Sequence, residues 1–143
     1  MFRWMYVSQS TIQESDNRSE VDLIVDKSIQ HNRKGGVTGA LIFSGDRFGQ
    51  IIEGPERTIS LLRENISKDT RHSAITTLLY GAFRDRIFSN WSLAYSGQSH
   101  FFGSILGAVE LGKDNQLSGS IASVEKLFNE FSADITGFRF ESH

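Results

Sequence analysis

The sequence of 143 residues predicts an α+β fold of the ferredoxin-like kind, in which one β-sheet carries two helices on one face. Short stretches rich in β-branched and aromatic residues predict strands, and two longer stretches with apolar residues at helical spacing predict helices. The order of these stretches is β-α-β-β-α-β-β, which is a split βαβ arrangement with one additional strand. A different, glycine-rich pattern begins after residue 97.

The first strand and the first helix are marked at both of their ends. Residues 2–8 are aromatic and β-branched, and they predict a strand that carries Tyr6. Residues 18–32 repeat apolar side chains at helical spacing, and Asn17 with Glu20 resembles a capping box at the start. Cations in the last turn and the glycines just beyond it predict the end of this helix.

A β-hairpin is predicted at the centre of the chain. Two runs rich in Val, Ile, Leu and Phe, residues 37–43 and 48–52, flank the cluster Ser44-Gly-Asp-Arg47. Gln50 is a lone polar amide inside the second run. An unpaired amide in a strand covered by helices would cost about 1–3 kcal/mol, so Gln50 needs a hydrogen-bond partner.

The second helix and the last two strands of the sheet follow the only proline of the chain. Pro55 suits the first position of a helix, and the apolar stripe after it predicts a helix up to residue 68. Residues 74–83 and 91–95 predict the fourth and fifth strands, and a charged connection separates them.

The last third of the chain has a pattern of its own. Residues 97–112 are apolar and glycine-rich, and Ser118 can cap a further helix that has an apolar stripe. We therefore expect a domain of residues 1–97, followed by a C-terminal helical extension of residues 98–143. We expect this extension to pack on the sheet face opposite the first two helices, because that face also needs a cover.

Composition excludes several classes of protein. The formal net charge is −2, with Lys and Arg scattered along the chain, so no basic surface for nucleic acid or an anionic membrane is expected. The absence of cysteine excludes disulfides and thiolate chemistry and fits a reducing cytoplasm. No apolar run approaches the roughly 20 residues of a membrane helix, and the start lacks the features of a signal peptide. We expect a cytoplasmic protein.

Residue patterns typical of enzymes are missing from the sequence. It contains no phosphate-binding loop, no nucleotide-binding glycine motif, no His-Glu-x-x-His and no nucleophile elbow. The four histidines lack the spacing of metal ligands, so no metal site is expected. Glu53 could act as a general acid, but no second carboxylate is identifiable, and a carboxylate near a helix start explains it more simply. We do not expect an enzyme.

Three polar residues remain at positions where the predicted elements pack together. Tyr6 lies on the first strand, Asn32 at the end of the first helix and Gln50 on the third strand. In the split βαβ order the first and third strands are central neighbours under the first helix, so these side chains can converge. Two interpretations stay open at this point: a buried tyrosine with two amides satisfied by the protein itself, or a ligand site.

Five short motifs occur in order along the first part of the chain. They are Tyr6-Val-Ser8, Asn32 with Gly36-Val-Thr-Gly39, Phe48-Gly-Gln-Ile-Ile-Glu-Gly-Pro55, Asp69-Thr-Arg-His72 and Phe88-Ser-Asn-Trp-Ser-Leu93. Together they resemble the BLUF family, the flavin-binding blue-light sensors, over roughly residues 1–97. The chain departs from the family pattern at Leu93, where Met is usual, and at Gly49, where a larger apolar residue is usual.

The resemblance implies a flavin held non-covalently between the two helices, with its ring edge toward the sheet. FAD is the usual form, and FMN and riboflavin are the alternatives. By matching position, light would drive electron and proton transfer from Tyr6 and a switch in the hydrogen bonds of Gln50, with Trp91 and Leu93 beside this switch. The residues implied in flavin binding are Tyr6, Ile24, Ser28, His31, Asn32, Arg33, Gln50, Asp69, Arg71 and His72.

The resemblance thus predicts a short photoreceptor without an output domain. It would signal to an unidentified downstream protein or through its own homo-oligomer. The alternative is a non-photoactive BLUF-like module for interaction or assembly, which Leu93 and Gly49 motivate. A small enzyme on the same scaffold is a third hypothesis, but the fold alone does not support it.

Overall fold

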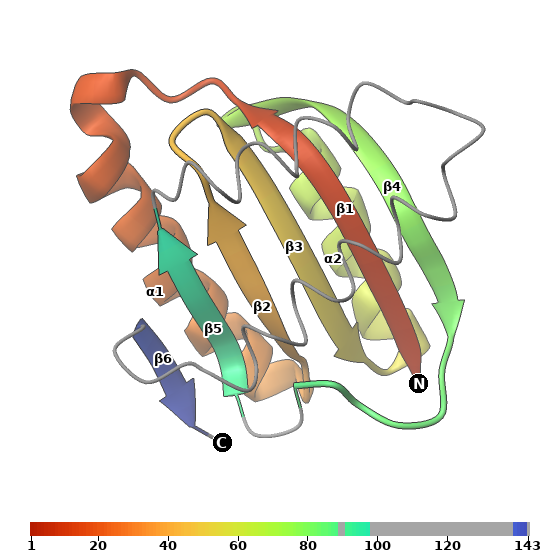
Figure 1. Ribbon diagram of the computed structural model, residues 1–143. Helices are drawn as coiled ribbons and strands as arrows, with labels where there is room; N and C mark the ends of the chain where they lie inside the picture. Colours follow the sequence, from red (N-terminus) through yellow and green to blue (C-terminus); the bar gives the residue numbers. More distant parts are fainter. Residues whose placement is uncertain (89–90, 98–138, 143) are drawn as a thin grey trace.

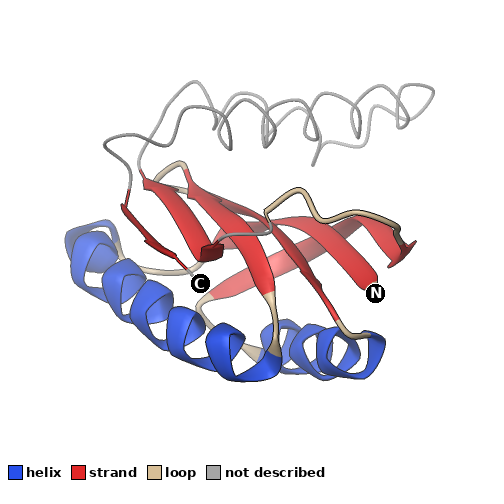
Figure 2. Cartoon of the chain, turned by 90° about the horizontal axis from the view of Figure 1, so that it is seen from below, coloured by secondary structure: helices blue, strands red, loops and turns tan. Residues whose placement is uncertain are grey.

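The computed structural model describes residues 1–88, 91–97 and 139–142, and it shows one sheet with strand order β4-β1-β3-β2-β5-β6 (Figure 1). Both helices lie on the same face of this sheet (Figure 2). The elements are β1 (Phe2–Ser10), α1 (Asn17–Gly35), β2 (Thr38–Phe43), β3 (Arg47–Gly54), α2 (Glu56–Lys68), β4 (His72–Ala82), β5 (Trp91–Gly97) and β6 (Arg139–Ser142).

The predicted α+β fold and the order of its elements are confirmed. Strands β1 and β3 are central and antiparallel, and their register places Tyr6 opposite Gln50. Strand β3 lies between β1 and β2 and is antiparallel to both, as the split βαβ arrangement requires, and the additional strand β5 pairs parallel with β2. Apart from β6, the predicted helical extension, residues 98–143, lies outside the described residues.

Three details differ from the sequence prediction. Helix α1 has Asp16 rather than Asn17 at its N-cap, without a side-chain capping bond, so the predicted cap was one residue late. Pro55 occupies the N-cap of α2 rather than its first helical position. Strand β6 was not predicted at all; it pairs antiparallel with β5.

Helix α1 runs three residues beyond its predicted end at residue 32 and stops at the glycine pair, because Gly36 adopts a left-handed conformation. Its φ is 69°, and its backbone N–H donates to the carbonyl oxygen of Asn32. Glycine takes this conformation without the steric cost that a side chain would impose. The chain can therefore turn directly from α1 into β2, which leaves Asn32 in the last turn over the sheet.

Each helix packs on its own apolar cluster on the shared face of the sheet. Under α1 the buried cluster consists of Val21, Val25, Ile29, Leu41, Phe43 and Phe48. Under α2 it consists of Trp4, Tyr6, Val37, Ile52 and Ile59. The two clusters are separate, so the groove between the helices is left for other side chains.

Gly39 is required by the close approach of β2 and β3. A Cβ atom built on Gly39 would lie 2.1 Å from the carbonyl oxygen of Ile51, far inside van der Waals contact. Any larger residue would have to push the two strands apart. This explains why a glycine stands inside a strand whose residues are all buried.

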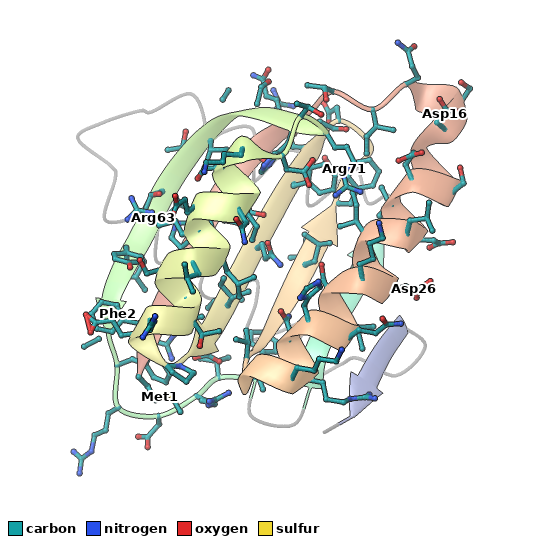
Figure 3. The ribbon with its side chains drawn as sticks, turned by 180° about the vertical axis from the view of Figure 1, so that it is seen from behind. Met1, Phe2, Asp16, Asp26, Arg63 and Arg71 are labelled. Carbon is teal, nitrogen blue, oxygen red and sulfur yellow. The ribbon has the colours of Figure 1, made fainter. Side chains whose placement is uncertain are left out.

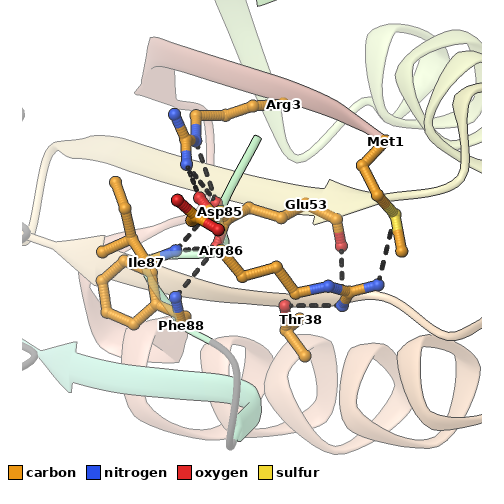
Figure 4. Close-up of polar contacts among 8 residues, drawn as sticks. All are labelled: Met1, Arg3, Thr38, Glu53, Asp85, Arg86, Ile87 and Phe88. Atoms are coloured by element: carbon orange, nitrogen blue, oxygen red, sulfur yellow. Dashed lines mark hydrogen bonds and ion pairs between the residues drawn. The ribbon is translucent and has the colours of Figure 1, made fainter. Parts of the chain in front are cut away.

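Glu53 is a structural anchor in β3, and not a free acid near a helix start. Its fully buried carboxylate accepts hydrogen bonds from Arg3 and from the backbone N–H groups of Ile87 and Phe88 (Figure 4). Close by, the Arg86 guanidinium donates to Thr38 Oγ1 at 2.9 Å. These contacts fix the connection from β4 toward β5 against the ends of β1, β2 and β3.

Candidate functional site

A cavity of about 280 Å³ lies between the two helices, with the sheet as its floor. The helices run in opposite directions, since Asp16 before α1 and Arg71 after α2 lie at the same end of the sheet (Figure 3). Each helical segment lines the cavity with residues at spacing i, i+3, i+4 and i+7, which is one face of a helix. These are Ile24, Lys27, Ser28 and His31 on α1, and Leu62, Asn65 and Ile66 on α2, with Asp69 just beyond the end of α2.

The remaining walls come from the sheet and from the ends of the helices. They are formed by Tyr6, Asn32, Leu41, Phe48, Gln50, Ile52, Arg71 and His72. Aliphatic and aromatic side chains make up most of this surface, and a few amide, hydroxyl and charged groups interrupt it. Such a mixture is typical of small-molecule sites, where apolar walls provide affinity and a few polar groups fix orientation.

Tyr6 and Gln50 form a buried hydrogen-bonded pair at the floor of the cavity. They are cross-strand partners on β1 and β3, and the phenol donates to Gln50 Oε1 at 2.5 Å. Both residues are nearly inaccessible to solvent, with exposed fractions of 3% and 6%. Burial raises the pKa of the Tyr6 phenol far above its usual value, and the negative charge of Asp69 adds to this shift. The phenol is therefore protonated and a hydrogen-bond donor at neutral pH.

Among the described residues, the NH2 group of the Gln50 amide has no hydrogen-bond partner. The amide oxygen is engaged by Tyr6, and within the described part of the chain no group accepts a hydrogen bond from the NH2. An unsatisfied buried donor costs about 1–3 kcal/mol, so it calls for an acceptor supplied by a ligand. Asn32, which is 3% exposed, lines the same cavity from the last turn of α1.

Trp4 packs against the Tyr6 ring and is not itself part of the cavity lining. Its ring stacks on the Tyr6 ring with centroids 4.4 Å apart, and its Nε1 donates to Thr77 Oγ1 at 3.0 Å. Trp4 itself is fully buried. The stack and the indole hydrogen bond restrict the Tyr6 ring, so the orientation of its hydroxyl is set by packing rather than by solvent.

His72 joins the floor of the cavity to the end of α2. Its Nδ1 lies 2.7 Å from Ser8 Oγ and its Nε2 lies 2.7 Å from the carbonyl oxygen of Ile66. Because a carbonyl oxygen only accepts, Nε2 carries a proton and donates to Ile66. The ring also meets Tyr6 edge to face, with centroids 5.9 Å apart. His72 is thus held in place by β1 and α2 together.

Asp69 and Arg71 form a bidentate ion pair at one end of the cavity. Arg71 Nη2 lies 2.6 Å from Asp69 Oδ2, and Nε lies 2.9 Å from Oδ1. The hydrogen bonds from Arg71 lower the pKa of the Asp69 carboxyl, and in return Asp69 raises the pKa of Arg71. Both groups are ionised at neutral pH, and their charges compensate each other.

Most of the site residues proposed from the sequence meet in this cavity. Of the ten residues implied in flavin binding, Arg33 alone is not part of its lining. The side chains of Trp91 and Leu93 lie outside the description; only the backbone of β5 is placed. Sequence reasoning missed two polar residues of the lining, Lys27 and Asn65, although each lies at helical spacing from a predicted site residue. It also missed the apolar lining residues Leu41, Phe48, Ile52, Leu62 and Ile66.

The described residues contain neither a cluster of metal ligands nor a helix that could cross a membrane. No group of three or more His, Asp or Glu side chains among them could hold a metal ion. Within the same residues, no helix combines the length and the apolar character that crossing a bilayer demands.

Comparison with known proteins gives matches to one family. The family model described as "BLUF: Sensors of blue-light using FAD" matches residues 1–94. The photoactivated adenylate cyclase subunit beta of Euglena longa is 33% identical over 91 residues, which are 64% of this chain and 11% of that protein. The blue light- and temperature-regulated antirepressor BluF of Escherichia coli (strain K12) is 32% identical over 73 residues, or 51% of this chain and 18% of that protein. The chain therefore matches less than a fifth of either relative.

Solved structures with the same fold are also similar. The dark state of BlrB, a BLUF protein, superposes with a TM-score of 0.73 at 24% identity, and the match covers 92% of this chain and 95% of that one. The ground state of BlsA gives a TM-score of 0.66 at 25% identity, over 75% of this chain and 71% of that one. The likeness to BlrB bears on the fold alone.

Proposed function

Because the chain belongs to the BLUF family, the blue-light sensors that use FAD, we propose that it is a blue-light photoreceptor that holds a flavin in the cavity between α1 and α2. The observation that carries this proposal is the Tyr6–Gln50 pair. Its phenol is already bonded to the amide oxygen, and the amide NH2 is left without an acceptor beside an open cavity. We propose FAD as the physiological flavin, following the family.

The residues present fit a flavin ring. A planar heteroaromatic ring needs two apolar walls, which Ile24 and Ile66 help to provide from opposite helices. It also carries carbonyl and ring-nitrogen acceptors along its edge, and the unpaired NH2 of Gln50 offers them a donor. Asn32 supplies a second buried amide on the same cavity.

When bound, the flavin supplies absorption of blue light and an excited state that accepts an electron. With the flavin as electron acceptor, Tyr6 would be the electron donor, and its proton would move along the hydrogen bond to Gln50 Oε1 while the amide passes a proton on to the flavin. The pKa of the phenol is raised by burial, so Tyr6 holds its proton in the dark and recovers it when the electron returns. Gln50 is left with an altered hydrogen-bond arrangement, which is the stored signal.

The sheet offers a direct route for this signal. Gln50 on β3 pairs with Leu41 on β2, and Leu41 pairs with Tyr95 on β5. A change at Gln50 therefore needs to cross only two strand pairings to reach β5, which carries Trp91 and Leu93. We propose that residues 1–97 form the light-sensing domain and that residues 98–143, as its extension, take the signal to a partner protein or a second copy of the chain in the cytoplasm.

We propose a sensor and not an enzyme. Glu53, the carboxylate that could have served as a general acid, is fully engaged by Arg3 and two backbone N–H groups. The Euglena longa relative is a photoactivated adenylate cyclase subunit by name, but this chain matches only 11% of its length.

Absorption spectroscopy of the purified protein tests the proposal. We expect a yellow protein whose flavin spectrum shifts slightly to the red in blue light and returns in the dark. A bound flavin without any light-induced shift, together with a stable oligomer on size-exclusion chromatography, would favour the alternative of a non-photoactive assembly module. A colourless protein that takes up no added FAD would refute the proposal.

A further inference from the structure

Charged side chains that line the cavity differ in whether they have a partner of opposite charge. Arg71 is the cation that the sequence motifs point to, but its guanidinium makes a bidentate pair with Asp69. Glu20 adds a further negative charge near Arg71 and contributes to the raised pKa of Arg71. This end of the cavity is therefore compensated, and it offers no net positive charge to an anionic ligand.

Lys27 is different, because it lines the same cavity without a counter-charge. It forms no hydrogen bond or ion pair within the described residues. Its neighbours one turn away on α1 are Leu23, Ile24, Gln30 and His31, so no carboxylate stands at i±3 or i±4. Lys27 is an exposed residue that also contributes to the cavity wall. Lys27 thus places a free positive charge at the opening of the cavity.

The groups around Lys27 suit a phosphate. Ser28 and His31 line the cavity on the same face of α1, and Asn65 lines it from α2. These side chains add hydroxyl, imidazole and amide donors to the ammonium group, and none of them is negatively charged. Gln50 lines the same cavity as these donors, so a ligand that bonds to Gln50 would have them within the same site.

We propose that Lys27 binds the phosphate of a phosphorylated flavin, so that the protein holds FMN and FAD more tightly than riboflavin. This inference rests on the proposed flavin site. It assigns the anionic subsite to a residue that no family motif marked. Arg71, in contrast, positions Asp69 and the end of α2.

Titration of flavin-free protein with riboflavin, FMN and FAD tests this inference, with quenching of flavin fluorescence as the readout. We expect Lys27→Ala to weaken FMN and FAD binding by about three- to tenfold and to leave riboflavin binding unchanged, since an exposed charge-assisted contact is lost. Raising the salt concentration should shrink the preference of the wild type for phosphorylated flavins. Lys27→Arg should retain that preference.

Lys34→Ala is the matched control, because Lys34 is an exposed lysine on α1 that does not line the cavity. It should bind all three flavins as the wild type does. Equal weakening of all three flavins by Lys27→Ala would assign Lys27 a packing role and overturn the inference. Equal wild-type affinities for the three flavins would also overturn it while leaving the flavin site intact. Failure of the wild type to bind any flavin would refute the proposed function, and the inference with it.

Discussion

Glu53→Gln changes one oxygen of a fully buried carboxylate into an NH2 group and keeps the size of the side chain. The carboxylate accepts from Arg3 Nε and Nη2 at 2.9 and 2.6 Å, and from the backbone N–H groups of Ile87 and Phe88 at 2.9 Å each. A carboxamide has only one acceptor oxygen. Either Arg3 or the two backbone donors must then face an NH2 group that cannot accept.

The cost follows from which donors lose their acceptor. If the amide oxygen stays with the backbone, the Arg3 charge, with a side chain only 15% exposed, loses its partner. Removing one partner of a buried ion pair costs about 3–5 kcal/mol, and residual contact with water lowers this figure. If the oxygen stays with Arg3, two backbone donors are orphaned at about 1–3 kcal/mol each. Both orientations therefore predict a loss of at least about 2 kcal/mol in the free energy of unfolding.

Urea unfolding followed by circular dichroism measures this loss. Glu64→Gln is the control, because Glu64 pairs with Lys68 at 3.3 Å on the surface of α2 and both side chains are mostly exposed. Loss of that pair should cost no more than about 0.5 kcal/mol. If Glu53→Gln were as mild as its control, the carboxylate would not hold the connection toward β5 as described.

Two further predictions concern the fold and the edge of the cavity. Gly39→Ala should destabilise the protein by about 3 kcal/mol or more, because the new Cβ overlaps the carbonyl oxygen of Ile51. Gly81→Ala is the control and should be close to neutral, because a Cβ at Gly81 has no atom within 4 Å. Equal unfolding midpoints of the two variants in urea would contradict this reasoning. Hydrogen bonds from Arg71 lower the pKa of Asp69 in the folded state. The ion pair therefore stabilises the fold above the unfolded pKa of about 4, and this stabilisation is lost as the pH falls through the lower pKa of the folded state. Asp69→Asn should therefore lose less stability than the wild type between about pH 7 and about pH 3, and identical acid profiles would contradict the assignment.

The sequence predicted the sheet and its two helices because each element carries a local signal. Apolar periodicity, glycines after α1 and the proline before α2 act within a few residues. Strand β6 has no such signal. It is four residues long, Arg139–Ser142, and its pairing with β5 joins segments more than forty positions apart. Pairings of that kind depend on tertiary packing, which a single sequence does not display.

The sequence predicted some residues of the site and missed others, because the missed ones depend on tertiary packing. Tyr6 and Gln50 were found because a polar residue inside an apolar strand demands a partner, and the structure places each opposite the other. Lys27 was missed because a lysine on an amphipathic helix is usually exposed to solvent, and the cavity beside it depends on the placement of α2. The role of Glu53 was misjudged, since its partners Ile87 and Phe88 are more than thirty residues away and act through their backbone.

The light-minus-dark absorption spectrum of flavin-loaded Tyr6→Phe, beside wild type and Tyr80→Phe, tests the central claim most directly. Tyr80 is a tyrosine on the neighbouring strand β4, opposite Trp4, that does not line the cavity. We predict a reversible red shift in the wild type and in Tyr80→Phe, and none in Tyr6→Phe, which lacks the hydroxyl bonded to Gln50. A full red shift in Tyr6→Phe would contradict the assignment of the Tyr6–Gln50 pair as the light-driven switch.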